Sequence, residues 1–127
     1  MKSKDGNIIL DKTFAFAIRI VNLYKYLTIS ATNKEYVISK QLLRSGTSIG
    51  ANTEEAIGAA SSADFINKLS IAYKEARETK YWIRLLRETG YLLESEAQSI
   101  LTDLEDISNI IAKIQITTKS NQLRNNS

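Results

Sequence analysis

An unbroken helical repeat in the third quarter of the chain constrains the fold more than any other feature. Between Phe65 and Leu86, seven residues recur at alternating spacings of four and three, the period of a helix buried along one side. They are Phe65, Leu69, Ala72, Ala76, Thr79, Ile83 and Leu86. The 127-residue chain has no proline and only five glycines, so long helices are not interrupted. We therefore expect a helix over residues 62–89, ended by Gly90.

Three further runs have the same period and predict three more helices. In residues 10–31 the expected buried stripe is Leu10, Phe14, Ala17, Val21, Tyr24 and Thr28, widened by Phe16, Ile20, Leu23 and Leu27. In residues 34–60 it is Ile38, Leu42, Ser45, Ile49, Asn52, Ala56 and Ala59. In the fourth run, from Ser95, it is Ala97, Ile100, Leu104, Ile107, Ile111 and Ile114.

Short connections separate these runs and set the expected architecture. Two capping boxes are predicted at helix starts, Thr32 with Glu35 and Ser95 with Gln98. Gly46 and Gly50 lie four apart on one helix face, where small residues allow a neighbouring helix to approach closely. Residues 1–127 are thus expected to form one all-α domain, an antiparallel up-down-up-down four-helix bundle. The polar ends, residues 1–8 and 119–127, are expected to be disordered.

Composition excludes several function classes. The chain has neither cysteine nor histidine, so disulfides, thiolate metal sites and the usual acid–base side chain near neutral pH are absent. We expect no enzyme activity, no cofactor, no metal and no small-molecule substrate. No stretch of about 20 apolar residues exists, and the N-terminus does not resemble a signal peptide, so a cytoplasmic protein without a membrane segment is expected. The net charge of +3 permits contact with nucleic acid without requiring it.

Four basic residues form a ridge along the third predicted helix. Arg77, Lys80, Arg84 and Arg87 fall within an arc of roughly 80°, with Tyr73 on the same line. Such a ridge is suited to a phosphate backbone, of RNA or DNA. The alternative is a solvated flank whose charges pair with carboxylates of the fourth helix, at Asp103, Glu105 or Asp106.

Two further groups have both a functional and a structural interpretation. Ile71, Trp82 and Leu85 form a second apolar group on the third helix, either an oligomer interface or the margin of a wide core. Arg44, Ser48, Asn52 and Glu55 lie on the second helix. They either line a ligand pocket or serve the structure, with Asn52 a buried amide bonded to a neighbouring helix and Arg44 ion-paired with Glu55.

Two segments of the sequence carry a family resemblance. The first is Gln41-Leu42-Leu43-Arg44-Ser45-Gly46-Thr47-Ser48-Ile49-Gly50-Ala51-Asn52 with Glu55. The second is Ser62-Ala63-Asp64-Phe65-Ile66-Asn67-Lys68-Leu69-Ser70-Ile71-Ala72 with Glu75, Glu78, Thr79 and Gly90-Tyr91-Leu92. Together they resemble the bacterial four-helix-bundle proteins first known from intervening sequences in large-subunit ribosomal RNA genes. The chain departs from the commoner pattern at Ala56, where glycine is usual, and lacks a proline near Gly50.

The resemblance implies a homo-oligomer, with a homopentamer as the expected form. It also implies kinship with the accessory proteins of diversity-generating retroelements, which are basic pentameric bundles that bind nucleic acid. Two functions follow as expectations: an oligomeric accessory protein that binds RNA or DNA with low specificity, or a structural scaffold that acts through protein contacts alone.

Overall fold

Four helices and one short π-helical segment make up the computed structural model, which describes residues 4–125. The elements are α1 (Lys4–Lys25), η1 (Tyr26–Ser30), α2 (Val37–Ile57), α3 (Ser62–Glu88) and α4 (Glu94–Asn125). No strand occurs among the described residues, so the expected all-α class is confirmed for them. No helix in this part of the chain is long and apolar enough to cross a membrane.

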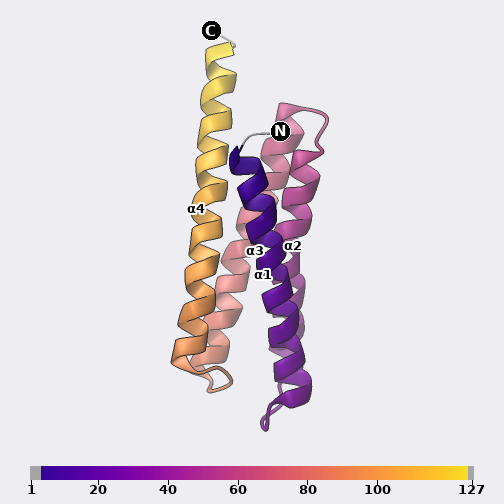
Figure 1. Cartoon of the computed structure of the whole chain (residues 1–127), viewed down its shortest axis with the longest axis vertical. Coiled ribbons are helices and arrows are strands. Elements are labelled where there is room, and N and C mark those ends of the chain that lie inside the picture. The colour runs from indigo at the N-terminus through magenta and orange to yellow at the C-terminus, as the bar shows by residue number, and fades with distance from the viewer. Residues whose placement is uncertain (1–3, 126–127) are drawn as a thin grey trace.

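The helices lie side by side in chain order around a common core. Contacts join α1 to α2, α2 to α3, α3 to α4, and α4 back to α1. In Figure 1 the α1–α2 and α3–α4 connections lie at the lower end of the molecule, and the α2–α3 connection lies at the upper end. α4, the longest helix, extends beyond the others at the upper end (Figure 1).

The buried stripes of α3 and α4 are those that the four-three spacing predicts. All seven predicted positions of α3 and all six of α4 are buried, which confirms both helices and their core faces. Leu69 and Ile83 are almost completely enclosed. These side chains, together with those from α1 and α2, form one continuous apolar core.

The core face of α1 lies about a quarter turn from the main predicted stripe, on the residues that were expected to widen it, Phe16, Ile20, Leu23 and Leu27. The buried residues are Ile9, Thr13, Phe16, Ile20, Leu23 and Leu27, again with four-three spacing. Phe14, which the sequence placed in the core, is 66% exposed, and Leu10, Ala17, Val21, Tyr24 and Thr28 are only half-buried. The helix carries two apolar stripes about 100° apart, and periodicity alone does not tell which one faces the core.

Close packing of α1 against α2 depends on the two glycines of α2. A Cβ atom on Gly46 would lie 2.9 Å from Cγ1 and from Cγ2 of Ile20, and one on Gly50 would lie 3.3 Å from the carbonyl oxygen of Thr13. The expected close approach is therefore confirmed. Because α2 turns these glycines inward, Thr53 is buried where Asn52 was expected, and Asn52 is only half-buried.

Both predicted capping boxes were wrong. In each case a glutamate carboxylate accepts a backbone N–H bond near the start of the helix. α2 begins at Val37, and the buried Glu35 carboxylate accepts bonds from the backbone N–H groups of Val37 (3.0 Å), Ile38 (3.0 Å) and Ser39 (2.6 Å). Its partner in the prediction, Thr32, is exposed and caps nothing in the described structure.

At the other ends the chain uses simpler caps. Ser61 caps α3 by accepting a bond from the Asp64 N–H group at 3.1 Å. α4 begins at Glu94, ahead of the expected Ser95, and Glu96 accepts from the Leu93 N–H group at 3.4 Å. Gly90 follows α3 with a φ of +86°, the conformation in which glycine ends helices, as predicted.

The described residues near both ends of the chain are helical, where the polar sequence predicted disorder. α1 begins at Lys4 and α4 continues to Asn125. The remaining residues of the expected disordered ends, 1–3 and 126–127, lie outside the described part. Helical hydrogen bonding is thus propagated along α4 past the point where its apolar stripe stops.

Candidate nucleic-acid interface

A groove of about 700 Å³ runs between α3 and α4 and contains most of the basic ridge. Arg77, Lys80 and Arg84 project from α3 into it, and Tyr73 and Tyr81 of the same helix line it with them. From α4 come Gln98, Leu101, Leu104, Glu105, Ser108 and Asn109. The four-three spacing of the buried residues fixes this placement, because it turns the flank of α3 that carries the cations toward α4.

Three of the four predicted cations are exposed and have no ionic partner. Within residues 8–125, whose side chains the structure describes, no carboxylate lies within ion-pairing distance of Arg77, Lys80 or Arg84. Arg87 differs from them: its side chain is only 20% exposed, and its Nε lies 3.5 Å from a Glu88 oxygen and 3.9 Å from a Glu94 oxygen. The groove therefore contains three of the four predicted cations.

The acidic residues that the sequence offered as partners of the ridge mostly face another helix. Asp103 pairs with Arg19 of α1 at 2.6 Å, and Asp106 pairs with Lys12 of α1 at 2.7 Å. Glu105 does line the groove. Two of the three carboxylates thus pair with α1, and Glu105 is the one that shares the groove with the cations.

A second face, between α2 and α3, brings together the other two groups that the sequence singled out. Arg44 of α2 pairs with Glu75 at 3.2 Å and with Glu78, both on α3. The indole N–H of Trp82 donates to the Glu78 carboxylate at 3.0 Å. This bond lowers the pKa of Glu78, burial opposes it, and the Arg44 guanidinium lowers the pKa further, so the carboxylate stays ionised.

Two details of the family signature differ from the structural interpretation of the sequence. Arg44 does not pair with Glu55; that carboxylate lies 3.5 Å from Lys68 Nζ on α3. The Asn52 amide donates within its own helix, to the carbonyl (2.9 Å) and the hydroxyl (3.0 Å) of Ser48. Ion pairing between helices was rightly expected, but a sequence does not specify which carboxylate comes within reach.

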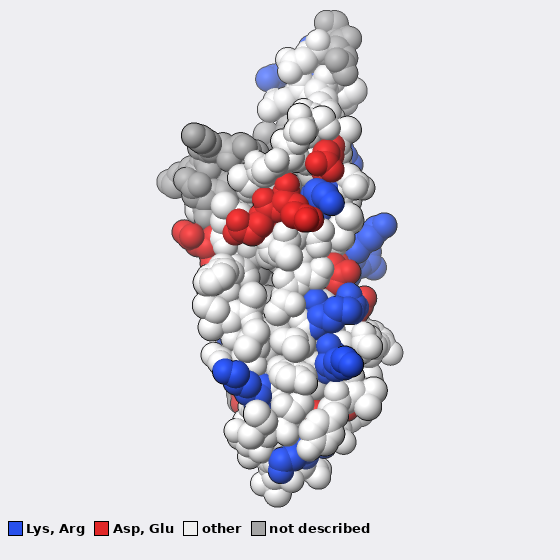
Figure 2. All heavy atoms as spheres, turned by 90° about the vertical axis from the view of Figure 1, so that its right-hand side faces the viewer, with Lys and Arg blue, Asp and Glu red and all other residues white. Residues whose placement is uncertain are grey.

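The apolar group on α3 lies at the margin of the core. Trp82 is half-buried and packs against the core cluster, and Ile71 and Leu85 are half-buried on the same flank. Figure 2, which views the right-hand side of Figure 1, shows a group of acidic side chains in the upper part of this face and several basic side chains over the lower part, with uncharged surface between them.

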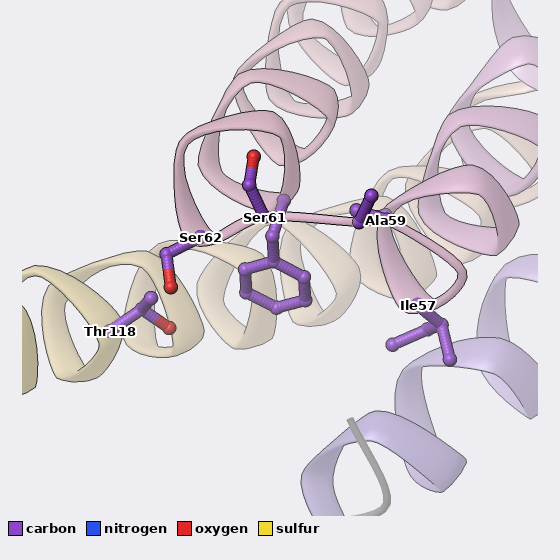
Figure 3. Close-up of a pocket in the computed structure, with 8 residues that line it drawn as sticks. Ile57, Ala59, Ser61, Ser62 and Thr118 are labelled. Atoms are coloured by element: carbon purple, nitrogen blue, oxygen red, sulfur yellow. The ribbon is translucent and has the colours of Figure 1, made fainter.

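A smaller hollow of about 370 Å³ lies at the α2–α3 connection. Ile57 and Ala59 border it on one side, and Ser61, Ser62 and Thr118 on the other (Figure 3). Its lining residues are alanine, isoleucine, serine, threonine and phenylalanine, so it presents neither a charge nor a metal-ligating group. Across the described residues no cluster of potential metal ligands occurs either.

Comparison with known proteins places this fold in a family. The family model of the 23S rRNA-intervening sequence protein matches residues 6–113. The chain belongs to this family. A comparison with curated proteins gave no significant match.

A crystal structure of another protein supports the same relationship. This protein of unknown function, from the S23 ribosomal protein family of Bacteroides thetaiotaomicron, is 50% identical. The match covers 87% of this chain and 97% of that one, with a TM-score of 0.84. The family resemblance expected from residues 41–55 and 62–92 is therefore confirmed.

The 23S rRNA-intervening sequence protein fold also places residues that sequence reasoning missed. Tyr81, Gln98 and Asn109 line the groove with the cations. Tyr81 lies four residues after Arg77, on the same flank of α3, so its position relative to the ridge was available from helical spacing. The α4 residues were not, because their relation to the ridge depends on how two helices pack.

Proposed function

We propose that this 23S rRNA-intervening sequence protein is an oligomeric bundle that binds nucleic acid with low sequence specificity in the α3/α4 groove. One observation carries the proposal: among the side chains that the structure describes, Arg77, Lys80 and Arg84 share a groove with no carboxylate within ion-pairing distance, while Lys12, Arg19, Arg44 and Lys68 are each engaged by a carboxylate. Unpaired cations in a row suit regularly spaced phosphates and give binding that is independent of sequence and sensitive to salt.

Replacement of all three groove cations tests the proposal. Arg77, Lys80 and Arg84 changed together to glutamine should abolish retention of RNA or DNA at about 50 mM salt, because backbone contacts supply the affinity. Where residual binding is measurable, the slope of log K against log salt should fall in magnitude by about two to three. The matched control changes Lys25, Lys34 and Lys40, which are exposed elsewhere, to glutamine. Equal loss in both triple variants would show that net charge alone, and not the groove, binds nucleic acid.

Two apolar surfaces support self-association. On α1, Phe14 is 66% exposed and Ile18 is 50% exposed, on the side of the helix away from the ion pairs with α4. The second surface is the α2/α3 face around Trp82. The two surfaces lie on adjacent sides of the bundle. If the first surface of one subunit contacts the second surface of the next, neighbouring subunits are related by a rotation. Repetition of such a heterologous contact gives a closed ring when the rotation between neighbours divides a full turn, and that is the case that we propose.

The homopentamer implied by the resemblance is the form that we propose, with the helices in antiparallel up-down-up-down order. The alternation of the connections in Figure 1 supports that order. In a ring the three cations are repeated in every subunit, and the resulting avidity exceeds the affinity of one groove. We propose no enzymatic activity, since the chain lacks the side chains most used for acid–base and thiol chemistry.

Substitution of the exposed α1 stripe tests self-association. Phe14→Glu together with Ile18→Glu should shift the mass measured by light scattering toward the monomer, because two buried charges are placed in the contact. Ile116→Glu, at an equally exposed position on α4, is the control and should leave the mass unchanged. A wild-type protein that is monomeric throughout the micromolar range contradicts the proposal.

A further inference from the structure

The ring of Tyr81 is held at the rim of the α3/α4 groove with much of its surface open. Its side chain is 54% exposed and lines the groove. It meets Trp82 edge to face, with ring centroids 5.1 Å apart and an interplanar angle of 74°. Trp82 is fixed in turn by its bond to Glu78. The tyrosine ring therefore contacts a neighbour that is itself held in place, and about half of the residue's surface stays accessible beside the cations.

Amide side chains stand on the opposite wall. Gln98 and Asn109 line the groove from α4. The Gln98 Nε2 donates to Thr102 Oγ1 at 3.3 Å, and this bond does not use the side-chain carbonyl oxygen, which can still accept a bond. Primary amides carry both donors and acceptors and can pair with the edges of unpaired bases.

These features separate a single strand from a duplex. In a duplex the bases are already paired and stacked. Only the phosphates can then contact the groove, through the three cations, and the tyrosine ring adds nothing to the affinity. An unpaired base has a free face that stacks on an exposed aromatic ring while the adjoining phosphates lie against the cations. We infer that the α3/α4 groove takes a single strand of RNA or DNA, with a base stacked on Tyr81. This inference rests on the proposed function and names its substrate class.

Binding of three labelled probes to the full chain tests the inference. The probes are oligo(U), oligo(dT) and a duplex, each of about 12 nucleotides or base pairs, measured by fluorescence anisotropy at about 50 mM salt. Both single strands should bind more tightly than the duplex. Tyr81→Ala should weaken single-strand binding about 5- to 150-fold, the usual effect of losing one stacking ring. Tyr81→Phe keeps the ring and should bind as the wild type does.

Two controls separate stacking from a structural role of Tyr81. Tyr36→Ala removes an exposed tyrosine that precedes α2 and lies outside the groove, and it should leave binding unchanged. In Tyr81→Ala the salt slope should stay the same, since no phosphate contact is lost, and the melting temperature should be nearly that of the wild type because the ring is largely exposed.

Trp82 is the only tryptophan in the chain, so its emission should change on single-strand binding in the wild type.

The outcomes distinguish this inference from the proposed function. Equal affinity for the duplex and the single strands, with no effect of Tyr81→Ala, overturns the inference; if the triple glutamine variant then still loses binding, the proposed function stands. Absence of binding to every probe at low salt overturns both. A preference between oligo(U) and oligo(dT) would show which of the two single strands the groove favours.

Discussion

Replacement of Glu35 by alanine should lower the free energy of unfolding by about 2–3 kcal/mol. The Glu35 carboxylate is buried, with 8% of the residue exposed, and accepts three backbone N–H bonds at the start of α2. It also accepts from the Ser39 hydroxyl at 2.8 Å. Alanine leaves these donors without a partner in a place that water reaches poorly. Urea unfolding followed by circular dichroism measures the change, and Glu54→Ala, at an exposed position on α2, should stay within about 0.5 kcal/mol of the wild type.

The same residue should make stability depend on pH. Burial raises the pKa of the Glu35 carboxyl, but the bonds from Ile38, Ser39 and Val37 outweigh it, so the pKa lies below the ordinary value of 4.5. Because the folded pKa is the lower one, the stabilisation is complete above pH 4.5 and is lost as the pH falls through the folded pKa. Glu35→Gln does not titrate at this position. The difference in the free energy of unfolding between this variant and the wild type should therefore become smaller in acid. A gap that stays constant between neutral and strongly acidic pH would argue against this cap.

Gly46→Val should destabilise the protein by about 1–3 kcal/mol, because it forces α1 and α2 apart. A Cβ atom at position 46 would lie 2.9 Å from two carbons of Ile20, which is fully buried and has no room to move away. Valine adds two methyl groups to that clash. The better helix propensity of valine offsets only a few tenths of a kcal/mol. Thermal and urea unfolding should both report the loss.

Two further variants show whether the loss comes from the helix contact. Ala51→Val places the same side chain at an exposed position of α2 and should change stability by no more than about 0.5 kcal/mol. Ile20→Ala removes the atoms that the valine meets, so Gly46→Val should cost less in that background, with a coupling of about 0.5–3 kcal/mol. If the two changes in the free energy of unfolding simply add, the loss in Gly46→Val does not come from the contact with Ile20.

The sequence predicts most reliably those helices in which only one face has an unbroken four-three spacing. In α3 and α4 one apolar stripe keeps an unbroken four-three spacing, which predicted both the helices and the faces that they bury. In α1 two stripes compete, and the one that contains Phe14 was expected in the core but is half-buried, with Phe14 itself exposed. The decision depends on the neighbour: α2 presents Gly46 and Gly50, and only the Thr13–Ile20 side of α1 fits against them. That fit is a property of two surfaces, which no period within one helix encodes.

The sequence by itself determined the helical class, the family and the composition of the basic ridge, since helical spacing, glycine positions and residue types are local properties. Only the tertiary structure decided how the charges are used. It turned Asp103 and Asp106 toward α1, engaged Arg87 with Glu88 and Glu94, and left Arg77, Lys80 and Arg84 together in a groove with Tyr81. The physical reason is that a charge interacts over a few ångströms with whatever lies nearest, and for residues far apart in the chain the packing of the helices sets that distance.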